Sequence, residues 1–205
     1  MPKQTFFNLN EQKRKLIEQA ALDEFSEYGY DASNMNRIVS GASIAKGSFY
    51  QYFEDKKDLY FHLIDALTKK KIQLFNPFLQ SYAQNAFAYN LNEIFRIGLA
   101  FADSDHKYYM LGEDFAKKQP EFMRELMEKY TPMSMDLFGK LLESAQSTGE
   151  LHEGINIPLT ASFISTLINH ATVTLITHAA PKEQRNQVIA EMISFIERAV
   201  LKKKE

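Results

Sequence analysis

The stretch that decides how this chain is organised is Ile44-Ala45-Lys46-Gly47-Ser48-Phe49-Tyr50-Gln51-Tyr52-Phe53. Phe49 and Phe53 are four residues apart, so with Ile44 they form an apolar seam along one side of a short helix. The other faces carry one cation, one residue without a side chain, a hydroxyl and two phenols: Lys46, Gly47, Ser48, Tyr50 and Tyr52. Such a face is typical of a helix that contacts phosphates and groove edges of DNA, although plain solvated surface has similar composition.

The residues just upstream favour the DNA-contacting interpretation. Ser33 is suited to cap a helix whose apolar stripe is Met35, Ile38 and Val39, and Gly41 marks its end. Ala42 and Ser43 then form a tight link to Ile44, and the next helix starts at Ala45. Two short helices joined by about three residues describe a helix-turn-helix.

Residues from about 12 to 70 resemble the DNA-binding region of the TetR family of transcriptional regulators. The resemblance rests on agreement in residue type and spacing at Phe25, Gly29-Tyr30, Ser33, Met35, Ile38, Ala45 to Phe53, and Lys56-Lys57-Asp58-Leu59. Two positions depart from the family pattern, since Ser43 replaces the usual turn glycine and Ala45 replaces a capping Ser or Thr. The resemblance implies a three-helix DNA-binding domain followed by a helical domain that binds a ligand and dimerises.

The predicted DNA contacts follow from that resemblance and from the chemistry of each side chain. Lys46 is expected to meet guanine O6/N7 or a phosphate, and Gly47 lets the helix approach closely. The start of the helix after Asp55, joined by its lysines, is expected to seat one phosphate. The full predicted DNA-binding set is Ser33, Asn34, Asn36, Lys46, Gly47, Ser48, Tyr50, Tyr52, Lys56 and Lys57.

Composition excludes several other classes of protein. The 205 residues carry a net charge of −2 and contain no cysteine, so disulfides, zinc ribbons and thiol catalysis are not expected. The sequence has neither a long apolar run nor the apolar core of a signal peptide, and a cytoplasmic location is expected. The five histidines form no metal-ligand motif, and no nucleophile motif or glycine-rich phosphate loop is present. We therefore expect no enzyme activity, no metal and no cofactor.

The chain is predicted to be all-α, with no strand. Residues 1–9 read as an arm, Asn10 caps a first helix that ends at Gly29, and Asp55 caps a helix that runs to about Phe75. Further helices are expected at 77–89, 92–102, 105–118, 120–147, 158–179 and 182–202. The domains are accordingly a helix-turn-helix DNA-binding domain over 1–54, a connecting helix over 55–75, and a ligand-binding and dimerisation domain over 76–205.

The second domain is rich in aromatic and methionine side chains, which pack adaptably and suit a cavity for apolar ligands, although such side chains are also ordinary core. Glu113, Asp114 and His170 are polar interruptions of apolar stretches and candidates for orienting a ligand. The favoured alternatives are a solvated helix face for Glu113 and a hydrogen-bonded interface for His170. The predicted ligand-binding set is Phe78, Tyr82, Phe95, Tyr109, Met110, Glu113, Met123, Met127, Phe163 and His170.

The last two helices are expected to pair with a second copy as a four-helix bundle, unless their faces pack only within the chain. Those faces are Ala161, Ser165, Ile168, Thr172 and Leu175 on one helix and Val188, Met192, Phe195 and Ala199 on the other. The hypothesis is a homodimeric repressor that binds a palindromic DNA operator and is released by a small apolar or amphipathic effector. The alternatives are a DNA-binding factor controlled by a protein partner, an interaction module that ignores DNA, and a helical enzyme.

Overall fold

The computed structural model describes residues 2–118, 120–177 and 182–203, but not the side chains of 116–123, 126 and 172–182. All regular elements in these ranges are helical, and the one β-bridge joins Leu151 to Leu201. The helices form two compact units, residues 1–72 with 102–119 and residues 73–101 with 120–205. The all-α prediction is confirmed.

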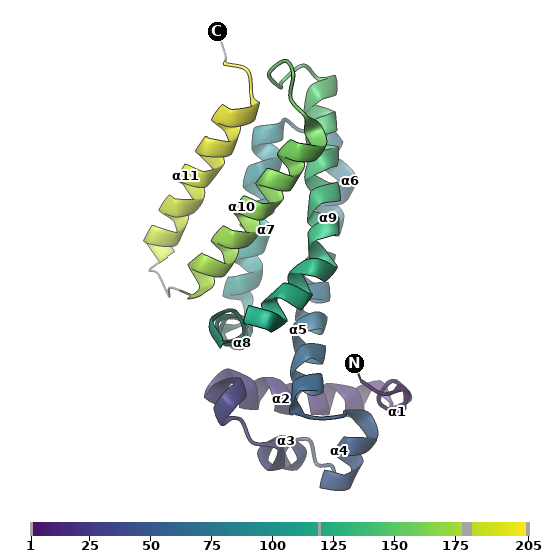
Figure 1. Cartoon of the computed structure of the whole chain (residues 1–205). Helices are drawn as coiled ribbons and strands as arrows, with labels where there is room; N and C mark the ends of the chain where they lie inside the picture. Colours follow the sequence, from purple (N-terminus) through teal and green to yellow (C-terminus); the bar gives the residue numbers. More distant parts are fainter. Residues whose placement is uncertain (1, 119, 178–181, 204–205) are drawn as a thin grey trace. The chain divides into compact units, whose positions relative to one another are not determined.

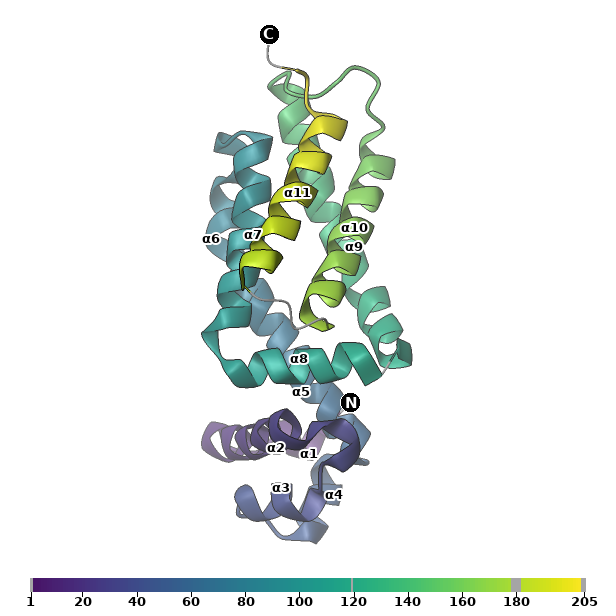
Figure 2. The same ribbon diagram turned by 90° about the vertical axis from the view of Figure 1, so that its left-hand side faces the viewer.

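The first unit is built on α2 (Glu11–Ala32), with α8 (His106–Lys118) on one side of it and α3 (Met35–Gly41) on the other (Figure 2). Its remaining helices are α1 (Gln4–Phe7), α4 (Lys46–Tyr52) and α5 (Lys56–Gln73, Figure 1). Their apolar faces meet in a core of fully buried side chains: Ile17, Phe25, Ile38, Phe49, Phe53, Leu59, Tyr60 and Leu111. This core fixes which side of α4 is exposed.

The caps expected from the sequence begin two of these helices. The Asn10 side chain accepts a hydrogen bond from the Lys13 amide at 2.8 Å, and Asp55 accepts one from the Asp58 amide at the same distance. Gly29 leaves helical geometry at φ +69° and ψ 172°, a region essentially open only to glycine, and one more helical turn follows. That turn sets the position from which α3 begins.

The second unit contains α6 (Asn76–Ser81), a 3₁₀ turn (Tyr82–Gln84), α7 (Phe87–Ser104), α9 (Pro120–Ser147), α10 (Ile157–Thr177) and α11 (Lys182–Val200). Helices α10 and α11 run side by side (Figures 1 and 2). Aliphatic and aromatic side chains from these helices form its core, among them Phe87, Leu91, Phe138, Leu142, Ile164 and Ile196. At one end, backbone bonds tie His152 to Val200 and Lys202 to Glu150.

Three segment assignments made from the sequence are wrong. Residues 1–9 are not a plain arm, because Gln4–Phe7 is helical and Phe6 is buried. The helix expected over 77–89 stops at Ser81, and α7 starts at Phe87 rather than at 92. The helix over 77–89 is interrupted because side-chain amides compete with the backbone amides for its carbonyls. Asn85 donates to the Ser81 carbonyl at 2.9 Å and buried Asn90 donates to the Tyr82 carbonyl at 2.9 Å.

Candidate nucleic-acid interface

Helix α4 presents the polar face that the sequence predicts. Phe49 and Phe53 are buried and stack with ring centroids 5.4 Å apart, which fixes the rotation of the helix. Lys46 and Gly47 are exposed as a result, Ser48 is partly exposed, and half of the Tyr50 side chain reaches solvent (50% exposed). No Cβ contact limits the space around Gly47, so close approach of another surface is open there.

The link between α3 and α4 is a Schellman motif. The Ser43 amide donates to the Ser40 carbonyl and the Ile44 amide to the Val39 carbonyl, both at 3.0 Å. Ser43 occupies the left-handed region at φ +52°, where a glycine is the usual residue. The serine therefore adopts the turn geometry that a glycine would give, and the helix-turn-helix keeps its expected shape.

The start of α3 differs from the prediction in one residue. Asn34, not Ser33, is its N-cap, and the Asn34 side chain accepts from the Asn36 amide at 2.8 Å. Ser33 is buried at the end of α2, where its hydroxyl donates to the Tyr30 carbonyl at 2.6 Å. Ser33 thus lies outside the exposed face, while Asn34 and Asn36 are both exposed.

Two more predicted contacts are turned inward. Tyr52 is only 7% exposed, and its ring centroid lies 6.4 Å from that of Phe6. The Lys56 ammonium donates to the carbonyls of Tyr30 at 2.6 Å and Ser33 at 3.2 Å, so it ties α5 to the end of α2. Lys57, by contrast, is exposed. The members of the predicted DNA-binding set that are exposed or partly exposed are Asn34, Asn36, Lys46, Gly47, Ser48, Tyr50 and Lys57.

Removing the phenol hydroxyl should affect DNA binding at the exposed Tyr50 but not at the buried Tyr52. We expect Tyr50→Phe to weaken DNA binding by about 0.5–1.5 kcal/mol, the net value of one hydrogen bond, and to leave stability unchanged because Tyr50 is half exposed. Tyr52→Phe, at a buried ring, is expected to keep DNA affinity within about twofold. Fluorescence anisotropy with a labelled duplex measures both. Equal effects of the two substitutions would contradict this assignment.

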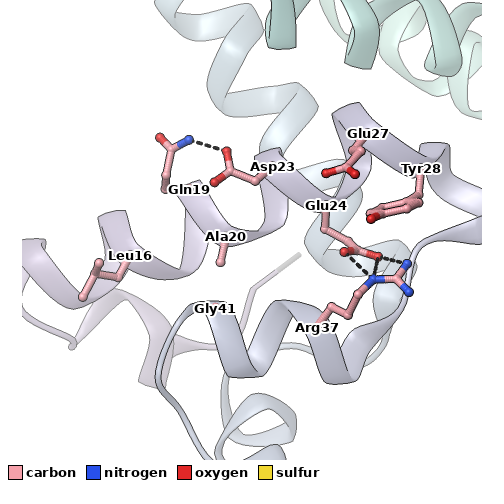
Figure 3. Close-up of a pocket in the computed structure, with 9 residues that line it drawn as sticks. All are labelled: Leu16, Gln19, Ala20, Asp23, Glu24, Glu27, Tyr28, Arg37 and Gly41. Carbon is pink, nitrogen blue, oxygen red and sulfur yellow. Dashed lines mark hydrogen bonds and ion pairs between the residues drawn. The ribbon is translucent and has the colours of Figure 1, made fainter.

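An open groove of about 320 Å³ lies between α2 and α3 (Figure 3). Its lining includes three carboxylates, and each already has a partner in the protein. Asp23 binds Lys107 at 2.7 Å, Glu24 binds Arg37, and Glu27 binds Tyr28. The side chains that line the groove therefore hold the helices together, and its carboxylates make it unsuited to binding a phosphate backbone.

The Glu24–Arg37 pair holds α3 on α2 (Figure 3). Glu24 is 6% exposed, and it accepts from the Arg37 Nε at 2.8 Å and from the Asn34 amide at 2.6 Å. Burial by itself would raise the pKa of Glu24, but the hydrogen bonds from Arg37 and Asn34 outweigh it and hold that pKa below 4.5. Arg37 also lies over the Tyr28 ring, 4.1 Å from its centroid. Sequence reasoning missed Arg37 because its partner is thirteen residues away.

The lowered pKa of Glu24 predicts a pH-dependent contribution to stability. A carboxylate with a depressed folded pKa stabilises the fold above its unfolded value near 4.5, and this contribution disappears as the pH falls through the folded value. We expect Glu24→Gln to lower the free energy of unfolding by about 1–2 kcal/mol at pH 7, since Arg37 is half solvated. Urea titrations of the two proteins should converge as the pH falls through the lowered pKa of Glu24. Glu27→Gln, at an exposed residue, is the matched control, and an equal loss there would refute the role of Glu24.

The predicted ligand-binding residues are divided between the two units. In the second unit Phe78 and Phe95 are core residues, Tyr82 and Met127 are partly buried, and Phe163 and His170 are exposed. In the first unit Tyr109, Met110 and Glu113 are partly buried on α8. Met123 lies outside the described side chains. Asp114, considered as a ligand contact, instead accepts from the Tyr30 amide and the Tyr60 hydroxyl.

The predicted dimer face of α10 is turned inward, whereas that of α11 is mostly exposed. Ala161, Ser165 and Ile168 on α10 are buried within the chain, as is Met192 on α11, while Thr172 and Leu175 lie outside the described side chains. On α11 the other three residues of the predicted face, Val188, Phe195 and Ala199, are exposed, with Phe195 at 59%. On α10 two apolar residues outside the predicted face are exposed, Leu159 and Phe163, the latter at 64%.

Comparison with known proteins agrees with this geometry. The model of the family "Bacterial regulatory proteins, tetR family" matches residues 17–63, which span α2 to α5. A solved TetR family transcriptional regulator from Chloroflexus aurantiacus is 26% identical and covers 99% of this chain and 100% of its own, with a TM-score of 0.62. The DNA-binding region of this chain is that of the TetR family.

As a TetR-family protein it is a DNA-binding transcriptional regulator. The uncharacterised HTH-type regulator YhgD of Bacillus subtilis is 33% identical over 61 residues, which are 30% of this chain and 32% of YhgD, so the match spans about a third of that relative. The transcriptional regulator FadR from Bacillus subtilis, solved in complex with stearoyl-CoA, shares the fold with a TM-score of 0.64. It is 20% identical over 89% of this chain and 95% of its own.

Two further findings concern the described part of this TetR-family chain. None of its helices there combines the length and apolarity needed to cross a bilayer. The same residues contain no group of three or more histidine, aspartate or glutamate side chains placed to hold a metal ion.

Proposed function

We propose that this TetR-family protein is a homodimeric repressor that reads a palindromic DNA operator with α4. The observation that carries the proposal is the exposed face of α4, where Lys46, Gly47 and Tyr50 point away from a core fixed by Phe49 and Phe53. Residues 1–54 would supply the DNA-binding domain, and residues 55–75 the connecting helix. Such a protein would act in the cytoplasm of a bacterial cell.

Dimerisation is favoured by the apolar side chains that α10 and α11 expose. Leu159 and Phe163 are four residues apart on α10, and Val188 and Phe195 are seven apart on α11, so each pair lies on one face of its helix. Exposed aromatic residues on helices are typical of surfaces that pack against a partner. A second copy would bury them in a four-helix arrangement and place two α4 helices on one operator.

Control by a ligand is favoured by the likeness to a regulator solved with stearoyl-CoA. We propose that residues 76–205 bind an apolar or amphipathic effector, and that this binding causes the protein to release the DNA. Phe78, Phe95, Tyr82 and Met127 are the residues of that unit proposed to contribute to its site. A protein partner acting on the same domain is the alternative, and a core that closes without a cavity favours it.

One experiment tests both the proposed reading of an operator and the proposed dimer. The purified protein is incubated with a random-sequence duplex library at moderate salt, and the bound fraction is amplified and sequenced over several rounds. We expect a palindromic sequence to be enriched, because a twofold dimer reads two equal half-sites. A folded dimer with no enrichment would overturn operator reading, and an enriched single half-site would overturn the dimer.

The ligand is tested on the recovered palindrome. Stearoyl-CoA, stearate and coenzyme A are titrated separately into the protein–DNA complex while anisotropy is followed. Release by stearoyl-CoA or stearate but not by coenzyme A would support an apolar effector. Release by none of them would turn the search to the protein-partner alternative.

A further inference from the structure

The C-terminal end of α4 is closed by the N-terminal segment of the chain. The last carbonyls of any helix lack intrahelical partners, and α4 has only seven residues. Three consecutive carbonyls at this end accept hydrogen bonds from residues 3 and 5. The Lys3 ammonium donates to Tyr50 at 2.8 Å, the Thr5 hydroxyl donates to Gln51, and the Lys3 amide donates to Tyr52 at 2.8 Å.

The fourth carbonyl of this turn has a partner as well. The Phe49 carbonyl accepts from the Phe53 amide at 2.9 Å. All four carbonyls of residues 49–52 are therefore satisfied, three of them by a segment more than forty residues distant. The positive charge of Lys3 also lies at the negative end of the helix dipole, where a cation is stabilising.

The capping segment is itself anchored in the core. Phe6 is 1% exposed, and its ring centroid lies 4.8 Å from that of Phe53 and 5.0 Å from that of His62. The Phe6 amide donates to the Lys3 carbonyl at 2.9 Å, which closes the turn that carries both capping residues. Phe6 thus fixes Lys3 and Thr5 over the end of α4.

We propose that Lys3 and Thr5 are positioning residues for DNA recognition, which act by holding the C-terminal turn of α4 in place. This inference rests on the proposed reading of DNA by α4. A helix of seven residues is unstable in isolation, so its geometry depends on its caps and packing. The turn that the cap secures carries Tyr50, which is one of the exposed DNA-facing residues.

The test compares Thr5→Val, which removes only the hydroxyl, with Lys3→Met and with the double variant. Gln4→Ala is the matched control, since Gln4 is exposed on the same segment and its side-chain amide donates to the Asn8 side chain rather than to α4. We expect the double variant to bind the palindrome recovered from the random library about threefold to tenfold more weakly, as the loss of two capping bonds implies. Gln4→Ala should bind like the unaltered protein.

Two additional readouts separate capping from a direct phosphate contact by Lys3. If capping is correct, the slope of log affinity against log salt stays unchanged, and the amides of residues 51–53 exchange several-fold faster in the DNA-free protein. A lysine that neutralises a phosphate would instead lower the salt slope by about one when removed, with amide exchange unaltered. That second pattern would overturn the proposal.

The exchange readout does not depend on DNA. If the unaltered protein bound no duplex, the proposed function would fail, while faster exchange in Thr5→Val would still establish the cap. Unchanged exchange and unchanged affinity in the double variant would refute the cap itself. Thermal unfolding of each variant confirms that the compared proteins are folded.

Discussion

Asp114→Ala is expected to lower the free energy of unfolding of its unit by about 2–6 kcal/mol, because two donors lose their shared acceptor and each buried unsatisfied group costs about 1–3 kcal/mol. One carboxylate oxygen of Asp114 accepts from the Tyr30 amide at 2.9 Å and from the Tyr60 hydroxyl at 3.0 Å. Tyr60 is fully buried, so no water can replace the lost partner without opening the core.

The state of Tyr60 strengthens this expectation. The pKa of Tyr60 is raised far above its ordinary value. Burial is the largest cause, and the charge of Asp114 and its hydrogen bond to the phenol add to it. The phenol therefore stays protonated and remains a hydrogen-bond donor at neutral pH. Because Tyr30 directly follows Gly29, where α2 leaves helical geometry, losing its amide bond should also loosen the segment that leads into α3.

A double-mutant cycle with Tyr60→Phe measures the effect. In the Tyr60→Phe background the phenol hydroxyl is already absent, so Asp114→Ala leaves only the Tyr30 amide without its acceptor. The decrease in the free energy of unfolding caused by Asp114→Ala should therefore be smaller by about 1–3 kcal/mol in that background. Urea unfolding gives the four free energies, and hydrogen exchange at the Tyr30 amide reports the second bond. Equal losses in both backgrounds, with unchanged exchange at Tyr30, would show that Asp114 does not link these groups.

Lys46→Ala is expected to weaken operator binding by about 1–3 kcal/mol, roughly 5-fold to 150-fold, the range for a good base contact. Lys46 is exposed at the first turn of α4. A lysine there can reach guanine O6 and N7 in the major groove or an adjacent phosphate. Stability should not change, because the side chain is surrounded by solvent.

Anisotropy titrations at two salt concentrations, with the selected palindrome and a scrambled duplex, distinguish these contacts. Loss confined to the palindrome indicates base reading, whereas equal loss on both duplexes with a lower salt slope indicates a phosphate contact. Lys69→Ala is the charge-matched control, since Lys69 is exposed on α5 and pairs with Asp65 at 2.8 Å. If Lys46→Ala behaved like Lys69→Ala, α4 would not be the recognition helix.

The sequence by itself determined the helix-turn-helix and the rotation of α4. The signals involved were local. Phe49 and Phe53 are four residues apart, and the side chain of Asp55 accepts a hydrogen bond from the amide three residues later. A helix closes its hydrogen bonds between residues i and i+4, so residues this close in sequence fix such features before any long-range contact forms. The family resemblance rests on the same short segment, and the family match to residues 17–63 confirms it.

Only the tertiary structure decided which polar side chains face outward and which are used inside. Lys56 and Lys57 are equivalent in sequence, yet Lys56 is committed to carbonyls 23 and 26 residues away. Lys3 caps a helix 47 residues on, and Asp114 binds an amide 84 residues away. A polar group entering the interior must find a partner wherever the fold provides one, and this choice depends on distances in space that sequence periodicity does not encode.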